Sequence, residues 1–137
     1  MIGAIAKSMR ETSAAGLLLV SLAACSTAAQ AASYTMYRDA GCGCCLKWAD
    51  HAAEGLDAEV IAENADMQVV KNLHGVPDEL RSCHTMIVEG YVIEGHVPAE
   101  AIRKLLRERP KDVIGIAVPG MPVGSPGMEY QDQRQPY

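Results

Sequence analysis

The sequence predicts one α/β domain, a sandwich in which helices cover a mixed sheet. Three observations predict it. Segments with strand and helix periodicity alternate through the first half of the chain, and an apolar hairpin pattern followed by an amphipathic helix fills the second half. The length of 137 residues fits one core, which the 49% hydrophobic content can fill. The order β-α-β-α-β-β-α therefore joins a parallel half to an antiparallel half.

An export signal precedes this domain. Lys7 and Arg10 come before an apolar run over residues 14–24, and small residues follow. The run is too short to span a bilayer as a helix. We expect residues 1–31 to be a signal peptide and the mature protein to be periplasmic.

Two processing sites compete within this signal. Ala29-Gln30-Ala31 fits an ordinary A-x-A cleavage site, whereas Leu22-Ala23-Ala24-Cys25 resembles a bacterial lipobox. In the second case residues 1–24 form a lipoprotein signal and Cys25 carries a lipid. That lipid is the only membrane attachment we expect.

The first strand and helix of the domain meet at a cysteine-rich turn. Residues 33–38 alternate as a strand does, and Asp39-Ala40-Gly41 ends them. A helix is predicted from the turn Cys42-Gly43-Cys44-Cys45 to about Glu54, with Gly55 as its left-handed end.

The second strand and helix follow at once. Residues 58–62 are predicted to form a short strand. Asn64 is the predicted N-cap of a helix that Gly75 and Pro77 end. The apolar face of this helix consists of Met67, Val70 and Leu73.

The second half begins with a polar loop and a hairpin. Residues 85–89 and 91–94 are rich in β-branched residues around Glu89-Gly90, which predicts two antiparallel strands. An amphipathic helix is predicted from Pro98 to Pro110. From Gly115 onward Gly, Pro and Met predominate, so we expect an extended tail without regular structure.

A thioredoxin-like core has this order of elements. In that fold the first strand runs into the first helix at the cysteine motif, and the loop before the third strand passes beside it. We therefore expect a thioredoxin-like domain over residues 33–129, followed by a C-terminal extension, 130–137. Cys83 and His84 lie in that loop.

The cysteines predict a soft-metal site. Cys42, Cys44 and Cys45 lie at a helix start, where unpaired N–H groups favour thiolates and should lower the pKa values of Cys42 and Cys45. Closely spaced thiolates repel one another unless a cation lies between them, and thiolate ligands select Cu(I) or zinc. Zinc is the less favoured ion because it usually draws four ligands from two separated turns. We predict one or more Cu(I) ions bound by Cys42, Cys44, Cys45 and Cys83.

Nitrogen and thioether donors are weaker candidates. His84 is included in the predicted site because the same loop carries Cys83, whereas His51, His74 and His96 are expected to be structural or solvated. Methionine fills core gaps more often than it binds metal. For that reason none of the mature-chain methionines is included: Met36, Met67, Met86, Met121 and Met128.

Two other roles for the cysteines stay open. A disulfide framework is permitted in an exported chain, although a bridge within residues 42–45 closes a very small loop. A periplasmic thiol-disulfide oxidoreductase would also place C-x-x-C at this helix start. Such enzymes keep a proline in the loop before the third strand, where this chain has Cys83. A metal-binding protein is therefore preferred to an enzyme.

The charge excludes one class of partner. The net charge is −5, and no basic cluster with interleaved aromatic residues is present, so nucleic acid is not expected to bind. The expected partners are copper ions and other periplasmic copper-handling proteins.

Several long motifs carry a family resemblance. They are the segment from Tyr34 to Cys45, Ser82-Cys83-His84-Thr85, residues 90–98 and the Gly-Pro-Met segment 119–128. Together they resemble the CopG-like family of small exported proteins, long catalogued as a domain of unknown function and found with copper-resistance systems. The resemblance implies copper handling on a thioredoxin-like fold, and it places the family's cysteine site on Cys42, Cys44, Cys45 and Cys83.

Overall fold

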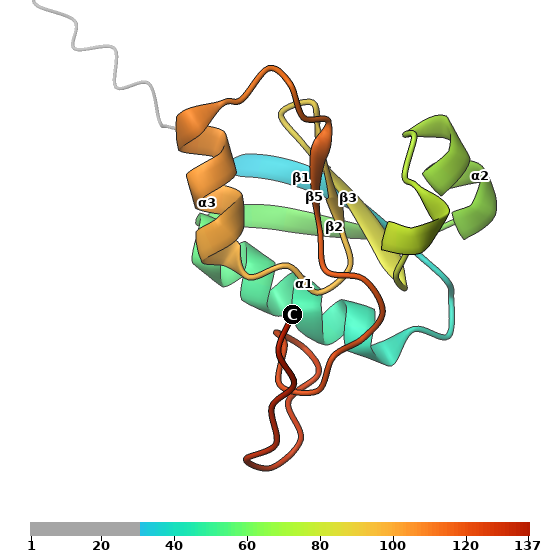
Figure 1. The fold of residues 1–137 in the computed structure, drawn as a ribbon, viewed down its shortest axis with the longest axis vertical. Helices are drawn as coiled ribbons and strands as arrows, with labels where there is room; N and C mark the ends of the chain where they lie inside the picture. Colours follow the sequence, from blue (N-terminus) through green and yellow to red (C-terminus); the bar gives the residue numbers. More distant parts are fainter. Residues whose placement is uncertain (1–30) are drawn as a thin grey trace, which may run out of the picture.

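The computed structural model describes residues 31–137, so the predicted signal and the lipid-anchor candidate Cys25 lie outside the described residues. The described chain folds into a mixed α/β structure with a five-stranded sheet and three helices (Figure 1). In chain order the elements are β1 Ala32–Arg38, α1 Gly43–Leu56, β2 Ala58–Asn64, α2 Met67–Leu73, the short 3₁₀ helix η1 Asp78–Leu80, β3 His84–Val88, β4 Tyr91–Glu94, α3 Ala99–Glu108 and β5 Gly115–Ala117.

The sheet has the strand order β2-β1-β3-β4-β5. Strand β1 is parallel to β2, β3 is antiparallel to both β1 and β4, and β5 is parallel to β4. The predicted succession of a parallel half and an antiparallel half is thus confirmed. The register pairs Thr85 of β3 with Glu94 of β4, which places the start of β3 beside the end of β4.

The hydrophobic core lies between one face of the sheet and helices α1 and α3. Trp48 of α1 is fully buried, and its indole N–H donates a hydrogen bond to the carbonyl of Val97 at 2.9 Å. Met36, Met86 and Ile93 come from three adjacent strands and are also fully buried, as is Ile102 of α3. Because successive side chains of a strand alternate, the neighbours of these residues point to the opposite face.

Helix α2 lies apart from α1 and α3, beyond the strands (Figure 1). Its N-cap is Asp66, whose carboxylate accepts hydrogen bonds from the amides of Gln68 and Val69, so the prediction of Asn64 as the cap is wrong. Asn64 and Asp66 both have side chains that suit a helix N-cap. Asn64 is used instead as the last residue of β2, where it pairs with Arg38.

Helix α1 continues through Gly55, which was predicted to end it, and stops at Asp57 in a left-handed conformation. The role of Gly55 is close packing. A Cβ atom added there would collide with the Cβ of Ala99 at the start of α3. The absence of a side chain therefore lets the two helices approach.

The hairpin turn and the tail complete the fold. Glu89 and Gly90 both have positive φ angles, as a two-residue hairpin turn requires. The tail was predicted to lack regular structure, but residues 115–117 form β5, which pairs with β4 at the sheet edge. Within residues 31–137, no helix has both the length and the apolar character needed to cross a membrane.

Candidate metal centre

The cysteine turn is built where β1 ends. The amide of Cys42 donates to the carbonyl of Asp39 at 3.0 Å, which closes the turn. The Arg38 guanidinium donates to the carbonyls of Asp39, Ala40 and Cys42 and so holds the turn from one side. Cys42 becomes the N-cap residue of α1, and Cys44 and Cys45 stand in its first turn.

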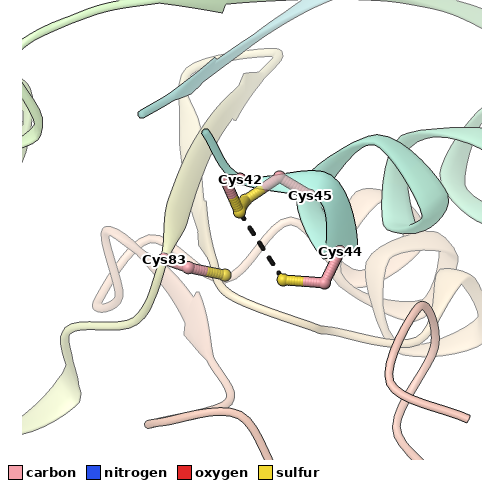
Figure 2. Close-up of side chains that lie close together, drawn as sticks. All are labelled: Cys42, Cys44, Cys45 and Cys83. Atoms are coloured by element: carbon pink, nitrogen blue, oxygen red, sulfur yellow. Dashed lines mark hydrogen bonds between the residues drawn. A yellow bond between two sulfur atoms is a disulfide. The ribbon is translucent and has the colours of Figure 1, made fainter. Parts of the chain in front are cut away.

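Four sulfur atoms converge at this point (Figure 2). Cys42 and Cys45 form a disulfide, and the Sγ atom of Cys44 lies 3.5 Å from that of Cys42. Cys83 enters from the loop before β3, and the four Sγ atoms all lie within 4.8 Å of one another. The structure therefore brings together all four cysteines of the predicted site, with two of them oxidised and Cys44 and Cys83 free.

Two imidazoles flank Cys83 on its other side. Its Sγ atom lies 3.3 Å from Nδ1 of His84 and 3.1 Å from Nε2 of His96. These three donor atoms form a second cluster within 4.8 Å. His84 was expected here, whereas His96 was expected to be structural or solvated; the structure places His96 beside Cys83 as well.

The hairpin register contains the signal that locates His96. Thr85 pairs with Glu94, and continuing this pairing outward by two residues on each strand places Cys83 opposite His96. The amide of Gly95 donates to the carbonyl of His84 at 2.9 Å, which extends the pairing beyond the strands. Because the turn Glu89-Gly90 is visible in the sequence, the register and the position of His96 follow from it.

The C-terminal tail fixes the tautomer of His96. Nδ1 of His96 lies 2.7 Å from the carbonyl oxygen of Pro126, which can only accept a hydrogen bond, so Nδ1 carries the proton. Burial lowers the pKa of His96 and keeps the ring neutral. The lone pair on Nε2 then faces the sulfur of Cys83, the arrangement found in metal-binding histidines whose second nitrogen is held by a carbonyl.

His84 is held neutral more strongly. Burial lowers its pKa to about 3, and the nearby His96 and Lys71 act in the same direction. Its ring is fully buried and lies against Trp48, with ring centroids 4.3 Å apart. Its Nε2 atom has no hydrogen-bond partner among the described residues. A neutral imidazole is the form that binds metal.

The free thiol of Cys83 is protonated near neutral pH. Burial raises its pKa to about 11, and the neighbouring Cys44 adds to the rise. The predicted lowering of the pKa values of Cys42 and Cys45 concerns their reduced forms and stays a prediction, because the two sulfurs are joined here. A soft cation at this point would displace the proton of Cys83 and offset the repulsion between sulfurs.

The tail packs directly on the first turns of α1. A Cβ atom added to Gly127 would lie 2.7 Å from the amide nitrogen of Trp48 and 2.9 Å from the carbonyl oxygen of Cys44, and its φ angle is +82°. Glu129 accepts hydrogen bonds from the amide of Gly127 at 3.0 Å and from Nε2 of His51 at 2.8 Å. His51 is thus part of the tail's attachment and not of the sulfur cluster.

The remaining donor candidates lie at different depths. His74 stacks on Tyr37 with ring centroids 6.5 Å apart, outside the cluster. Met36, Met67 and Met86 are buried core residues, and Met121 is half exposed. Met128 lines a groove beside Cys44, together with Gly43, Lys47 and Val123.

Comparison with known proteins identifies two similar solved structures. Two solved structures, described as "Copper resistance protein copG- Form 1" and "Form 2", are each 45% identical in sequence, with TM-scores of 0.71 and 0.70. Each alignment covers 77% of this chain, and 83% and 84% of the respective solved chains. A family model described as "Protein of unknown function, DUF411" matches residues 80–128, and no curated protein matches significantly. On the strength of the identity and coverage to the solved structures, the chain belongs to the CopG-like family.

Proposed function

We propose that this protein is an exported copper-binding protein that holds Cu(I) through the thiolates of Cys42, Cys44, Cys45 and Cys83 and contributes to copper resistance. The observation that supports it most is the convergence of four sulfur atoms, from two separate segments, within 4.8 Å. Thiolates are soft ligands that favour Cu(I), and three of the four crowd onto one helical turn, which suits sulfurs that bridge between ions. His84 and His96 supply neutral nitrogen donors next to Cys83.

The proposal requires the reduced form of the cysteine turn. The Cys42–Cys45 disulfide must take up two electrons and two protons from a thiol reductant to give two thiols. Copper then displaces protons from the thiols, including the one that burial retains on Cys83. In the oxidised form only Cys44, Cys83 and the two imidazoles keep free donor atoms, so oxidation weakens the proposed site.

We further propose a thioredoxin-like scaffold for this site. Two features support it: the strand order of the sheet and the location of the C-x-x-C pair at the start of α1 with the loop before β3 beside it. Periplasmic location, and attachment through Cys25 if the lipobox is used, belong to the same proposal. Copper ions and other periplasmic copper-handling proteins are its proposed partners.

One observation favours a second function, a thiol-disulfide oxidoreductase. Cys42 and Cys45 form a disulfide in C-x-x-C spacing at a helix N-terminus, as redox-active pairs do. The loop before β3 argues against it, because Cys83 and His84 fill the place where oxidoreductases of this type present a proline to substrate. A protein substrate would have to displace the half-buried thiol of Cys83 and two buried imidazoles.

Titration of the reduced protein with Cu(I) under nitrogen tests the copper proposal. With a competing Cu(I) chelator as the reporter, we expect submicromolar affinity that disappears when all four cysteines are replaced by serine. The matched control is the same wild-type protein with the Cys42–Cys45 disulfide kept intact, which should bind more weakly. Submicromolar affinity in the four-serine variant would show that the cysteines are not the site.

A further inference from the structure

A buried charged network lies on the face of the sheet opposite the hydrophobic core. Nζ of Lys71, in α2, lies 2.5 Å from Oε1 of Glu94, in β4, and both side chains are almost completely buried. The hydroxyl of Thr85 accepts from Lys71 at 3.0 Å and donates to Oε2 of Glu94 at 2.6 Å. The copper proposal uses none of these three residues.

The network ends on the loop that carries Cys83. The amide of Ser82 donates to Oε1 of Glu94 at 2.6 Å, so the carboxylate holds the residue immediately before Cys83. The Ser82 hydroxyl donates to the carbonyl of Gly120 in the tail. Gly95, directly after β4, makes this approach possible, since a Cβ atom there would lie 2.6 Å from the Ser82 side chain.

The buried ion pair of Lys71 and Glu94 is not explained by its contribution to the stability of the fold alone. Burying an ammonium and a carboxylate removes both from water, and apolar replacements of similar volume are often neutral or stabilising. Removing one partner leaves an unpaired buried charge. The described hydrogen bonds of Lys71 and Glu94 reach Ser82 and Thr85 but not Cys83, so neither charged residue contacts the sulfur directly.

We propose that Lys71 and Glu94 are positioning residues for Cys83. Glu94 fixes the Ser82 amide and thereby the direction in which the Cys83 side chain leaves the backbone, and Lys71 neutralises and orients the Glu94 carboxylate. This inference rests on the proposed function for its effect on copper, while its effect on the position of Cys83 is independent of copper. The network lets α2, which contributes no sulfur, set the distance between Cys83 and the cysteine turn.

Two double variants separate the hydrogen bond from the charges. In Lys71→Met with Glu94→Gln, both charges are gone but an amide oxygen can still accept from Ser82. In Lys71→Met with Glu94→Leu, both charges and the acceptor are gone. Both pairs avoid a lone buried charge, and urea unfolding measures whether they fold equally well.

Two measurements report separately on the position of Cys83 and on the affinity for copper. The first is the alkylation rate of Cys83 relative to Cys44 in the reduced, copper-free protein, measured by peptide mass spectrometry with iodoacetamide. The second is Cu(I) affinity against a competing chelator. We expect the Gln variant to stay within twofold of wild type in both, and the Leu variant to alkylate Cys83 at least fivefold faster and to bind Cu(I) at least tenfold more weakly.

Val88→Ala serves as a stability control, because Val88 is fully buried at the far end of β3. It should lower the free energy of unfolding without changing either readout. Equal behaviour of the Gln and Leu variants would overturn the inference, whether both resemble wild type or both lose binding. A wild type without Cu(I) affinity would defeat the copper proposal alone, because the alkylation rates would still report on Cys83.

Amide hydrogen exchange in the wild-type protein tests the same anchoring without a substitution, and therefore does not depend on whether the Leu variant folds. The Ser82 amide hydrogen should exchange with solvent as slowly as the amides in the centre of β3, because a buried carboxylate holds it. Exchange of Ser82 at the rate of an exposed loop amide would contradict the proposed anchoring.

Discussion

Nε2 of His96 lies 3.1 Å from Sγ of Cys83, while Nδ1 of the same ring is held by the carbonyl oxygen of Pro126. The ring therefore points a lone pair at the sulfur cluster, and the segment that orients it is the tail that follows β5. His96→Gln should lower the Cu(I) affinity of the reduced protein about tenfold, or about 1.4 kcal/mol. Chelator competition measures the change. His74→Gln is the matched control, because His74 lies outside the cluster, and equal affinities for both variants would remove His96 from the donor set.

Replacement of Cys83 by proline distinguishes copper binding from thiol-disulfide exchange. Cys83→Pro removes one sulfur and gives the loop the residue that oxidoreductases carry there, so Cu(I) affinity should fall at least tenfold, about 1.4 kcal/mol. The wild type, reduced and metal-free, should show negligible reduction of insulin disulfides under conditions in which a thioredoxin is active. Cys83→Ser controls for loss of the sulfur alone. Thioredoxin-like rates in the wild type, with copper binding unchanged in Cys83→Pro, would favour the oxidoreductase.

The attachment of the tail to α1 depends on Gly127. In Gly127→Ala the new methyl group meets the backbone of Trp48 and Cys44, and the residue must also keep a positive φ angle. We expect a loss of roughly 1–3 kcal/mol in the free energy of unfolding from overpacking, in addition to the strain of about 1–2 kcal/mol for a left-handed alanine. Gly120→Ala shares the positive φ but meets nothing within 4 Å, so it isolates the strain. Urea unfolding should show a larger loss of unfolding free energy in Gly127→Ala than in Gly120→Ala. Equal losses would show that the tail does not pack tightly on α1.

The stability of the fold should depend on pH through His84. Its pKa is about 3 in the folded protein and 6.5 in the unfolded chain, so below pH 6.5 the unfolded chain binds more protons. The stabilisation is complete above pH 6.5 and declines as the pH falls towards 3, at up to about 1.4 kcal/mol per unit. Burial lowers the pKa of His96 as well, which adds to the slope. Urea unfolding between pH 7 and 4 should show a shallower dependence in His84→Gln than in wild type, and equal slopes for the two proteins would contradict the assignment of this pH dependence to His84.

The sequence contains most of what determines the element order. Periodicity located the strands and helices within a few residues, because each buries an apolar face whose spacing is local. Glu89-Gly90 also determined the hairpin, since both residues adopt positive φ angles there. The convergence of the four cysteines followed from two local facts, the turn at the start of α1 and a loop adjacent to it.

The features that escaped prediction depend on distant partners. Asn64 and Asp66 are equivalent as caps, and only the pairing of β2 with Arg38 decides between them. The three residues of β5 have no strand pattern of their own and are ordered by β4. Lys71 and Glu94 are ordinary charged residues in the sequence, and only the packing of α2 on the sheet brings them together.

The candidate metal centre combines residues that are synthesised at different times, because Pro126 and Gly127 pack beside the cysteine turn at the start of α1. A chain that is synthesised from its amino end presents the cysteine turn early, whereas the carbonyl that orients His96 is added only after β5. Bringing together segments so far apart in sequence costs loop-closure entropy before their contact is made. The cysteines of the proposed copper site are therefore synthesised before the segment that orients His96, and His96 is held in place only once the tail has packed.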